Sequence, residues 1–381
     1  MGYRPSCPAG EVGRDEEAKG CGKMTMPKEA APAHFIKSAF FAAALLIMVA
    51  TPSVVAHSPL SSGDNTRLAS AAVISDVAKS WAIYSALEGE MARYYSFNAR
   101  EGERIYATLF ISPQSKESGF LPYLAIMGPW TGGGCSLPSY VESPDGYGCM
   151  ILRGEIAEEA YYEGFSPSAF YNVARLDINA PADGKYYLAV FALPEGVNES
   201  ARGNFGLAVG YKEEFTLAEW AYLPISLLAI YQWGGQSPLE SVALIFAIPA
   251  LILSVAMIRR QWRKIFSTPP SALMGIAGAA CLGTASNLMY QISYCLRWAP
   301  FGAEVGITLT FLLIQAVIGV NLLRTAYLHP VPSLKVRAAS AILGIIAFAL
   351  YAGFYIAPAS AIIASIAPSR RRKDNGAAAG I

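Results

Sequence analysis

Histidine is scarce in this sequence, with three residues among 381, at positions 34, 57 and 329. Paired histidine ligands for a haem inside a helical bundle are therefore excluded, and no His-rich, Cys-rich or HExxH zinc motif occurs. The exported domain predicted below keeps at most His57, at its extreme N-terminus, which excludes an ordinary Ser-His-Asp triad there. Acidic residues are numerous enough for a two-carboxylate glycosidase, although no spacing selects a pair. We predict a protein that is not an enzyme and that uses no cofactor or metal.

Charged residues are missing from the middle of four apolar stretches in the C-terminal part. Each stretch has the roughly 20 residues that a helix needs to cross a bilayer. The stretches cover about 239–258, 271–294 and 304–323, and the fourth begins near Ala338. Pumps and proton-coupled carriers keep ionisable groups at mid-membrane depth, where these stretches have essentially none. The sequence therefore predicts a transmembrane bundle of about four helices over residues 237–368.

The two halves of the chain differ strongly in charge. Residues 58–236 hold 11 basic and 20 acidic side chains, whereas residues 237–381 hold 12 basic and 3 acidic ones. The acidic half offers no basic face for phosphates, so we expect no nucleic-acid partner. Basic loops follow the first and third apolar stretches, and the positive-inside rule places both loops in the cytoplasm. We therefore predict a multi-pass protein of the cell (plasma) membrane whose acidic half is extracytoplasmic.

The basic tail, residues 369–381, conflicts with this topology. Four crossings would place its Arg370–Lys373 cluster outside, which the positive-inside rule disfavours. A last segment that breaks at Pro358 and re-enters would return the tail to the cytoplasm. The sequence leaves both alternatives open, and we expect the tail itself to be disordered.

The N-terminus is typical of an exported protein. Two lysines precede the apolar run Ala39–Ala50, and small residues lead up to Ala56. An apolar core of this length is short for a spanning helix and typical of a signal peptide. We predict a leader and signal peptide over residues 1–56, with a retained anchor as the alternative. Because the polar leader is long, translation could instead start at Met24 or Met26.

Residues 58–213 have the period-two pattern and the composition of β-strands. Trp81–Leu87, Ala92–Phe97 and Arg104–Ile111 are rich in aromatic and β-branched residues and are separated by short polar turns. Further strands are predicted at Leu121–Met127, Met150–Arg153, Val173–Ile178, Lys185–Ala192 and Asn204–Tyr211. Eight short strands indicate an all-β sandwich of jelly-roll type, in a multi-domain protein whose second part is all-α.

Two pieces of this domain carry a family likeness. Met91–Ile105 contains a YYxF strand followed by a GExx turn, and Pro181–Val190 and Gly203–Val209 form a pair of strands of GxYxLxV type. Both pieces resemble the bacterial pre-peptidase C-terminal-like domains, although Ala92-Arg93 stands where that family usually has an acidic residue. The resemblance implies a β-sandwich that serves as an accessory binding or stabilising module.

A glycine-rich loop from Gly128 to Gly148 interrupts the strand pattern. Cys135 and Cys149 flank most of it, and an oxidising compartment would allow them to form a disulfide. Long loops at the ends of sandwiches often carry function. The candidate ligand-loop residues are Trp130, Gly132, Gly133 and Gly134. A disulfide-pinned connection without a ligand is the alternative and the favoured interpretation.

Three further polar or sulfur-containing features are weaker signals. The acidic and aromatic stretch Glu155–Phe165 is interpreted as a solvated segment, with a calcium or partner site as the alternative. Asn198 begins an Asn-Glu-Ser glycosylation acceptor pattern. Cys281 and Cys295 lie in an apolar stretch and are interpreted as buried thiols.

Residues 214–236 are apolar but contain aromatic residues near both ends. These residues are Trp220, Tyr222, Tyr231 and Trp233. Tryptophan and tyrosine are enriched at the headgroup level of membranes. We predict an interfacial segment that seats the sandwich on the bilayer. A full span here would invert both basic loops and is rejected.

Amides and small residues are the notable side chains inside the predicted spans. Asn287, Gln291 and Gln315 are predicted to form hydrogen bonds between helices, and pore-lining amides are the alternative. Gly275, Ala279 and Gly283 recur at four-residue spacing, which lets helix backbones approach closely.

Together these features predict a non-enzymatic, membrane-anchored, extracytoplasmic binding or accessory module. Its expected partners are the lipid bilayer and a protein of a larger membrane complex. The alternative function is a transporter or channel component that uses amide-lined helices.

Overall fold

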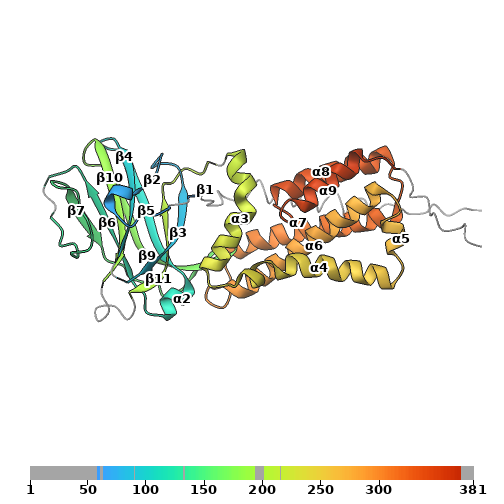
Figure 1. The fold of residues 1–381 in the computed structure, drawn as a ribbon, viewed down its shortest axis with the longest axis horizontal. Coiled ribbons are helices and arrows are strands. Elements are labelled where there is room, and N and C mark those ends of the chain that lie inside the picture. The colour runs from blue at the N-terminus through green and yellow to red at the C-terminus, as the bar shows by residue number, and fades with distance from the viewer. Residues whose placement is uncertain are drawn as a thin grey trace, which may run out of the picture. The chain divides into compact units, whose positions relative to one another are not determined.

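A computed structural model of the chain describes residues 58–60, 63–89, 91–131, 134–193, 201–214 and 216–369. Four predicted features lie outside the described residues: the leader and signal peptide, the ligand-loop glycines Gly132 and Gly133, the glycosylation candidate Asn198, and the basic tail from Arg370 onward. A β-rich part comes first in the described chain, and helices follow it (Figure 1).

Eleven described strands form two sheets that share one hydrophobic core. The first sheet has the order β1-β3-β11-β5-β9-β8 and the second has the order β2-β4-β10-β6-β7. The strands are β1 (Ser58–Pro59), β2 (Ala72–Val73), β3 (Trp81–Glu88), β4 (Ala92–Ala99), β5 (Arg104–Ile111), β6 (Pro122–Gly128), β7 (Gly148–Leu152), β8 (Tyr161–Glu163), β9 (Ser168–Asn179), β10 (Gly184–Ala192) and β11 (Arg202–Val209). A short 3-10 turn, η1 (Leu68–Ser70), precedes β2.

The predicted β-rich domain is confirmed, and each of the eight predicted strands overlaps an observed one. The expectation of a simple eight-stranded jelly roll is corrected, because β1, β2 and β8 extend the sheets to six and five strands. These three strands have two or three residues each. A segment that short shows no alternation, so no sequence pattern could reveal it.

Both outer faces of the sandwich are partly covered. On the second sheet, the segment between β6 and β7 packs Val141 and neighbouring apolar residues against Tyr94 and Phe191. On the first sheet, the covering element is a helix, α3 (Leu217–Trp233). This coverage explains why both Tyr94 and Tyr95 are buried although they are adjacent on β4 and point to opposite faces.

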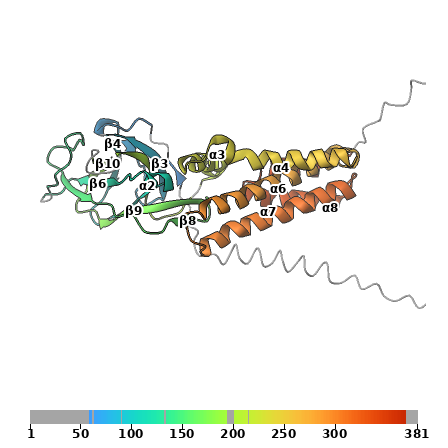
Figure 2. The ribbon, with the colours of Figure 1, turned by 90° about the horizontal axis from the view of Figure 1, so that it is seen from below.

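Three described helices are long and apolar enough to cross a membrane, which suggests a membrane protein. They are α4 (Pro238–Ile258), α6 (Pro269–Cys295) and α7 (Ala303–Leu328). The other helices are α2 (Pro113–Glu117), α5 (Trp262–Ile265), α8 (Leu334–Ala349) and α9 (Ile356–Ile366). Figures 1 and 2 show α4, α6 and α7 side by side, with α3 running across their direction at the end nearest the sheets.

The predicted bundle of about four spanning helices is wrong in its last member. Its place is taken by α8 and α9, each shorter than the spans, which pack against each other as a hairpin. The break lies between Leu350 and Tyr355, before Pro358 rather than at it. Tyr351, Phe354 and Tyr355 adopt positive φ values there, which reverses the chain direction.

The hairpin returns the chain to the level at which α8 begins. The Arg337 guanidinium, in the first turn of α8, donates hydrogen bonds to the carbonyl oxygens of Ser365 and Ala367, and to Ser369 Oγ. The two ends of the hairpin therefore lie together. This geometry corresponds to the alternative in which the last segment re-enters instead of crossing. The end of the described chain lies at the same level as the α7–α8 connection.

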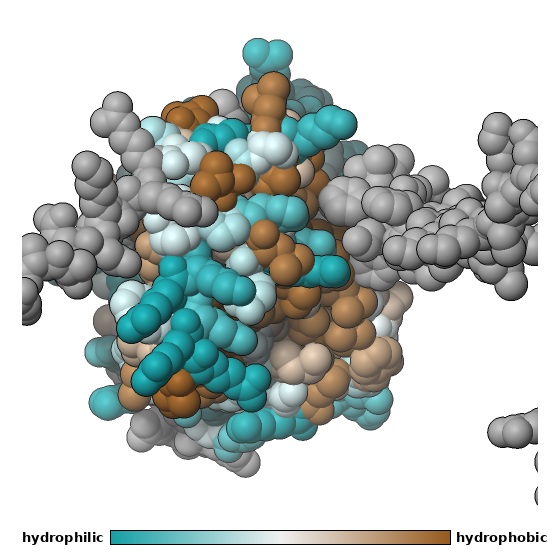
Figure 3. Space-filling model, turned by 90° about the vertical axis from the view of Figure 1, so that its right-hand side faces the viewer, coloured by the Kyte–Doolittle hydropathy of each residue, from teal (hydrophilic) through white to brown (hydrophobic). Residues whose placement is uncertain are grey.

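The same end of the helical part is rich in exposed bases. Arg259, Arg260, Arg263, Lys264, Arg324 and Lys335 are exposed there. Figure 3 looks onto this end and shows hydrophilic side chains gathered beside apolar ones. No described residue between Ser241 and Ala303, or between Val305 and Ser369, is acidic. The charge pattern used for the topology prediction is therefore a compact basic surface at one end of the bundle.

Candidate functional site

Two of the three amides predicted inside the bundle, Gln291 and Gln315, form hydrogen bonds between elements. Gln291 and Gln236 exchange two hydrogen bonds, with N···O distances of 2.6 and 3.0 Å. Gln315 Nε2 donates to the Leu350 carbonyl oxygen at 3.1 Å. Asn287 borders a cavity of about 30 Å³, which is room for about one water molecule. No hydrogen-bond partner is found for Asn287 Oδ1 among the described residues, and both the structural role and the pore-lining alternative stay predictions for these amides.

The four aromatic residues of the predicted membrane seat have different surroundings. Trp233 and Tyr231 are buried, at 7% and 5% exposure, and Trp220 is half-buried. Tyr222 alone of the four is mostly exposed, at 64%. Seating on a membrane stays a prediction for α3 as a whole, with Tyr222 as its exposed aromatic residue.

The predicted disulfide between Cys135 and Cys149 is present. Trp130 lies flat against the sandwich, because its indole ring covers Gly128 and Gly148 and stacks on Tyr186 with a centroid distance of 5.9 Å. A tryptophan in this position closes the edge of the core. The described part of the loop, which includes the exposed Gly134, borders neither the cavity near Asn287 nor the larger one described next.

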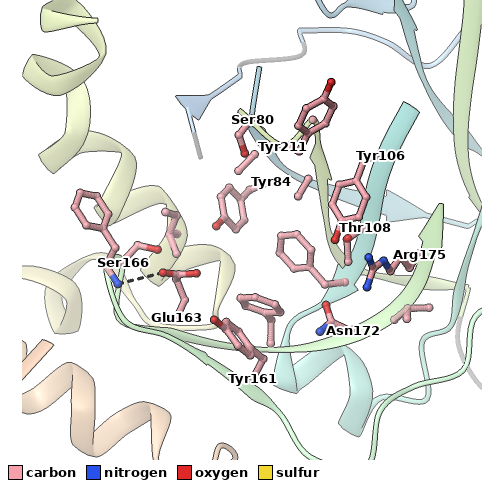
Figure 4. A pocket seen from close by; sticks show the side chains of 18 of the residues that line it. Ser80, Tyr84, Tyr106, Thr108, Tyr161, Glu163, Ser166, Asn172, Arg175 and Tyr211 are labelled. Carbon is pink, nitrogen blue, oxygen red and sulfur yellow. Dashed lines mark hydrogen bonds between the residues drawn. The ribbon is translucent and has the colours of Figure 1, made fainter. Parts of the chain in front are cut away.

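The principal cavity in the described chain lies on the outer face of the first sheet. Its volume is about 600 Å³, and its walls come from β3, β5, β9 and β11, from the segment around β8, and from α3 (Figure 4). Its aromatic lining residues are Tyr84, Tyr106, Phe110, Tyr161, Phe165, Phe170 and Tyr211. Leu223, Leu227 and Ile230 form the apolar wall on α3.

The helix that closes this cavity is fixed at both ends. At its start, Thr216 and Glu219 form a capping box, and Lys79 Nζ lies 2.6 Å from Glu219 Oε1. At its end, the Trp233 indole N–H donates to the Phe205 carbonyl oxygen at 3.0 Å. Trp233 also packs edge-on against Tyr84, with a centroid distance of 5.1 Å. The α3 wall of the cavity is therefore attached to the β-rich part near both of its ends.

A buried carboxylate, Glu163, lies at the α3 side of the cavity. Its side chain is 9% exposed, and the Phe165 backbone N–H donates to its Oε1 at 3.1 Å. Burial raises the pKa of Glu163 from 4.5 to about 7, and the nearby acids Glu213 and Glu304 add to the rise. Figure 4 shows the hydroxyl groups of Tyr84 and Tyr161 on the same side of the cavity as this carboxylate. Near neutral pH, Glu163 is therefore poised between its charged and neutral forms.

Arg175 lies at the opposite side of the cavity and is already engaged (Figure 4). Its Nη2 atom is 3.5 Å from Asp177 Oδ2, and its guanidinium lies 5.0 Å from the centre of the Tyr106 ring. Arg104 also binds Asp177, at 2.8 Å, and this hydrogen bond lowers the pKa of Asp177. The two acids thus differ: Asp177 is exposed and paired with bases, whereas Glu163 is buried and has no described base against it.

The sequence analysis missed this site. Glu163 falls in the stretch Glu155–Phe165 that was interpreted as solvated, and the structure buries it instead. One available signal was the outer face of β5, where Tyr106 and Phe110 alternate with residues of the core. Aromatic side chains on the outward positions of a sandwich strand indicate that something covers that face. The covering helix, α3, begins at Leu217 whereas β5 ends at Ile111, so no local pattern identifies it.

No protein-family model and no curated protein matches this chain. The resemblance to pre-peptidase C-terminal-like domains therefore stays a prediction, while the β-rich domain followed by helices is observed. Within the described residues, no group of three or more His, Cys, Asp or Glu side chains is arranged to hold a metal ion.

Proposed function

We propose that this protein is a membrane-anchored extracytoplasmic binding module, and that the cavity between the first sheet and α3 holds a small amphipathic ligand. The observation that carries the proposal is the cavity itself. Its volume of about 600 Å³ falls within the range of roughly 300–1,000 Å³ that is typical of small-molecule sites. Aromatic and aliphatic walls with a few polar groups are also typical of such sites.

The position of the cavity supports a ligand that comes from the membrane surface. One face of α3 lines the cavity, whereas Tyr222 and Ile225 on its other face are 64% and 62% exposed. Exposed apolar side chains beside three potential spanning helices favour contact with lipid. In this arrangement the cavity lies at the bilayer boundary, on the extracytoplasmic side according to the distribution of basic residues.

The test is to identify what the native protein carries. The full chain is extracted from its own membranes into lipid nanodiscs, and the molecules released on denaturation are identified by mass spectrometry. Ser226→Trp places a bulky ring in the cavity, and Ile225→Trp places the same ring on the exposed face of α3 as the matched control. We expect a compound that is enriched with the wild type and with I225W and is lost with S226W. Identical contents in all three preparations would contradict the proposal.

The role as an accessory subunit of a larger membrane complex is a separate part of the proposal. It is supported by the accessory role that the family resemblance implies and by the apolar surface of α4, whose Leu239, Phe246 and Ile258 are exposed. The mass of the intact assembly in mild detergent tests it. A stoichiometric second protein is expected, and a lone copy of this chain would contradict the accessory role.

A further inference from the structure

The charges around the cavity are unevenly distributed. Glu155, Glu163 and Glu213 line it, and Glu304 at the start of α7 adds to the negative potential at Glu163. Arg175 is the base among the described lining residues, and its Nη2 atom lies 3.5 Å from Asp177, which also pairs with Arg104. The cavity therefore attracts cations and repels anions, and the attraction is strongest at its α3 side.

Glu163 is a buried acid that has no basic partner among the described residues. It is 9% exposed, it receives a single backbone hydrogen bond among its described contacts, and no described base forms an ion pair with it. Burying a carboxylate without a cation is costly. Above its pKa, Glu163 therefore offers an unpaired negative charge to a positively charged group of a molecule that enters the cavity.

The surroundings of Glu163 suit an organic cation better than a metal ion. Tyr84 and Tyr161 lie on the same side of the cavity as the carboxylate (Figure 4), Phe165 and Phe170 also line the cavity, and aromatic faces attract ammonium groups. A hard metal ion instead needs several oxygen ligands, and one carboxylate does not provide them. Beyond the rings, the α3 wall of Leu223, Leu227 and Ile230 is apolar.

We infer that the cavity binds an organic monocation, with its ammonium group against Glu163 and an apolar tail along α3. The inference rests on the proposed function, because it names the chemical class of the ligand in that same cavity. The shared chemistry is an ammonium group on an apolar body, which a membrane lipid headgroup or a free amphipathic amine would supply.

Binding of a permanently charged ammonium should depend on pH through Glu163. The groups on the elements packed around it are the acids Glu155, Glu213 and Glu304, the base Arg175, and the hydroxyls of Tyr84, Tyr161 and Tyr162. The three tyrosines have raised pKa values and stay protonated near neutrality. Glu163, with a pKa of about 7, changes charge between pH 6 and pH 8.

The test compares two esters that differ in one atom. Choline hexanoate carries a trimethylammonium group, and 3,3-dimethylbutyl hexanoate has carbon in place of the nitrogen. Radiolabelled forms are bound to the full chain in phosphatidylglycerol nanodiscs, with empty nanodiscs subtracted. At pH 8 we expect the cation to bind at least about tenfold more tightly than its neutral analogue. Its affinity should fall roughly tenfold at pH 6, because Glu163 takes up a proton.

Two variants distinguish the contribution of Glu163 to cation binding from that of another acid in the cavity. Glu163→Gln should abolish both the preference for the cation and the pH dependence, while Glu155→Gln, an exposed acid of the same cavity, should keep both. Equal binding of the two esters by the wild type, or a preference that survives E163Q, would overturn the inference. If neither ester binds, the inference fails, whereas the proposed function is judged separately by the molecules that the native protein releases.

A third arm identifies the source of the cation. Phosphatidylcholine, which carries the same trimethylammonium group, is added to the nanodiscs while choline hexanoate binding is measured. Competition supports the inference with a lipid headgroup as the ligand. Undiminished binding supports it with a free amphipathic amine.

Discussion

At the scale of single residues, Glu163 makes the stability of the protein depend on pH. Its pKa is about 7 in the folded protein and close to 4.5 when the side chain is exposed to water. The folded state therefore holds the proton more tightly than the unfolded state. This contribution is most favourable below about pH 4.5 and is lost as the pH rises to about 7, with a total of about 3 kcal/mol.

Glu163→Gln should remove that dependence. We expect E163Q to be more stable than the wild type at pH 8, by up to about 3 kcal/mol, with the difference shrinking towards pH 5. Thermal unfolding of both proteins in ligand-free nanodiscs at the two pH values measures this. A constant difference between the two proteins across the range would show that Glu163 titrates normally.

Trp233 should be the most sensitive residue of the α3 contact with the sheet. It is 7% exposed, packs against Tyr84 and Phe110, and donates a hydrogen bond to the Phe205 carbonyl oxygen. Trp233→Phe removes the hydrogen bond and part of the packing, at a cost of about 1 kcal/mol. Trp233→Ala should cost about 3–5 kcal/mol.

The control for this prediction is another aromatic residue of the same helix. Tyr222→Ala removes an exposed ring, so its effect should stay within about 0.5 kcal/mol. Chemical denaturation of the three variants gives the comparison. If Y222A were as harmful as W233A, the stability of α3 would come from its outer face.

At the scale of elements, α6 is the helix on which the others pack, and its glycines determine how closely they approach. The predicted ladder is partly confirmed: Gly283 lies against the α4 backbone and Gly275 against Ile265 of α5. The sequence spacing missed the closest contact with α7, where Gly278 meets Gly319. A Cβ atom on Gly278 would lie 2.7 Å from the Gly319 carbonyl oxygen.

Alanine at this crossing should therefore destabilise the protein, although alanine has a higher helix propensity than glycine. Gly278→Ala and Gly319→Ala should each destabilise the protein by about 1–3 kcal/mol, because the two backbones must separate. Gly306→Ala, on the same α7 helix, meets nothing within 4 Å and should stabilise by about 0.5–1 kcal/mol. Opposite signs in thermal unfolding confirm the contact, and a stabilising effect at all three positions would contradict it.

At the scale of the whole molecule, the α8–α9 hairpin brings the last described residues back to the level at which α8 begins. Arg337 ties the end of the hairpin to its beginning, so Ser369 and the α7–α8 connection lie at one level. This geometry is the one expected of the re-entrant alternative. We predict that the basic surface and the end of the hairpin lie on the same side of the membrane.

Cysteine labelling tests this arrangement. Ser333→Cys and Ser369→Cys should react with a membrane-impermeant maleimide from one side of oriented vesicles, and Ser143→Cys on the sandwich from the other. Cys281 and Cys295 are buried and should stay unreactive. Labelling of S369C from the same side as S143C would show that the last segment crosses the membrane completely.

Sequence reasoning located most elements because their signals are local. Strands of five residues or more are recognised in the sequence by alternating polar and apolar residues. The helices α4, α6 and α7 are recognised by the length of their apolar stretches. The fourth apolar stretch was wrongly predicted to be one spanning helix, because hydropathy does not show whether an apolar segment continues straight or reverses the chain direction. The segment Leu350–Tyr355 reverses the chain without any polar residue to mark a turn other than its tyrosine hydroxyls.

The order of sheet and helices, the disulfide pair and the separation of charge were therefore determined by the sequence alone, since each depends on neighbouring residues or on composition. The cavity was decided by tertiary structure. One of its walls is α3, which is attached to Lys79 near one end and to Phe205 at the other, both distant in the sequence. Glu163 acquires its raised pKa in the same way, because burial by elements far along the chain, and not its own sequence neighbours, removes its water.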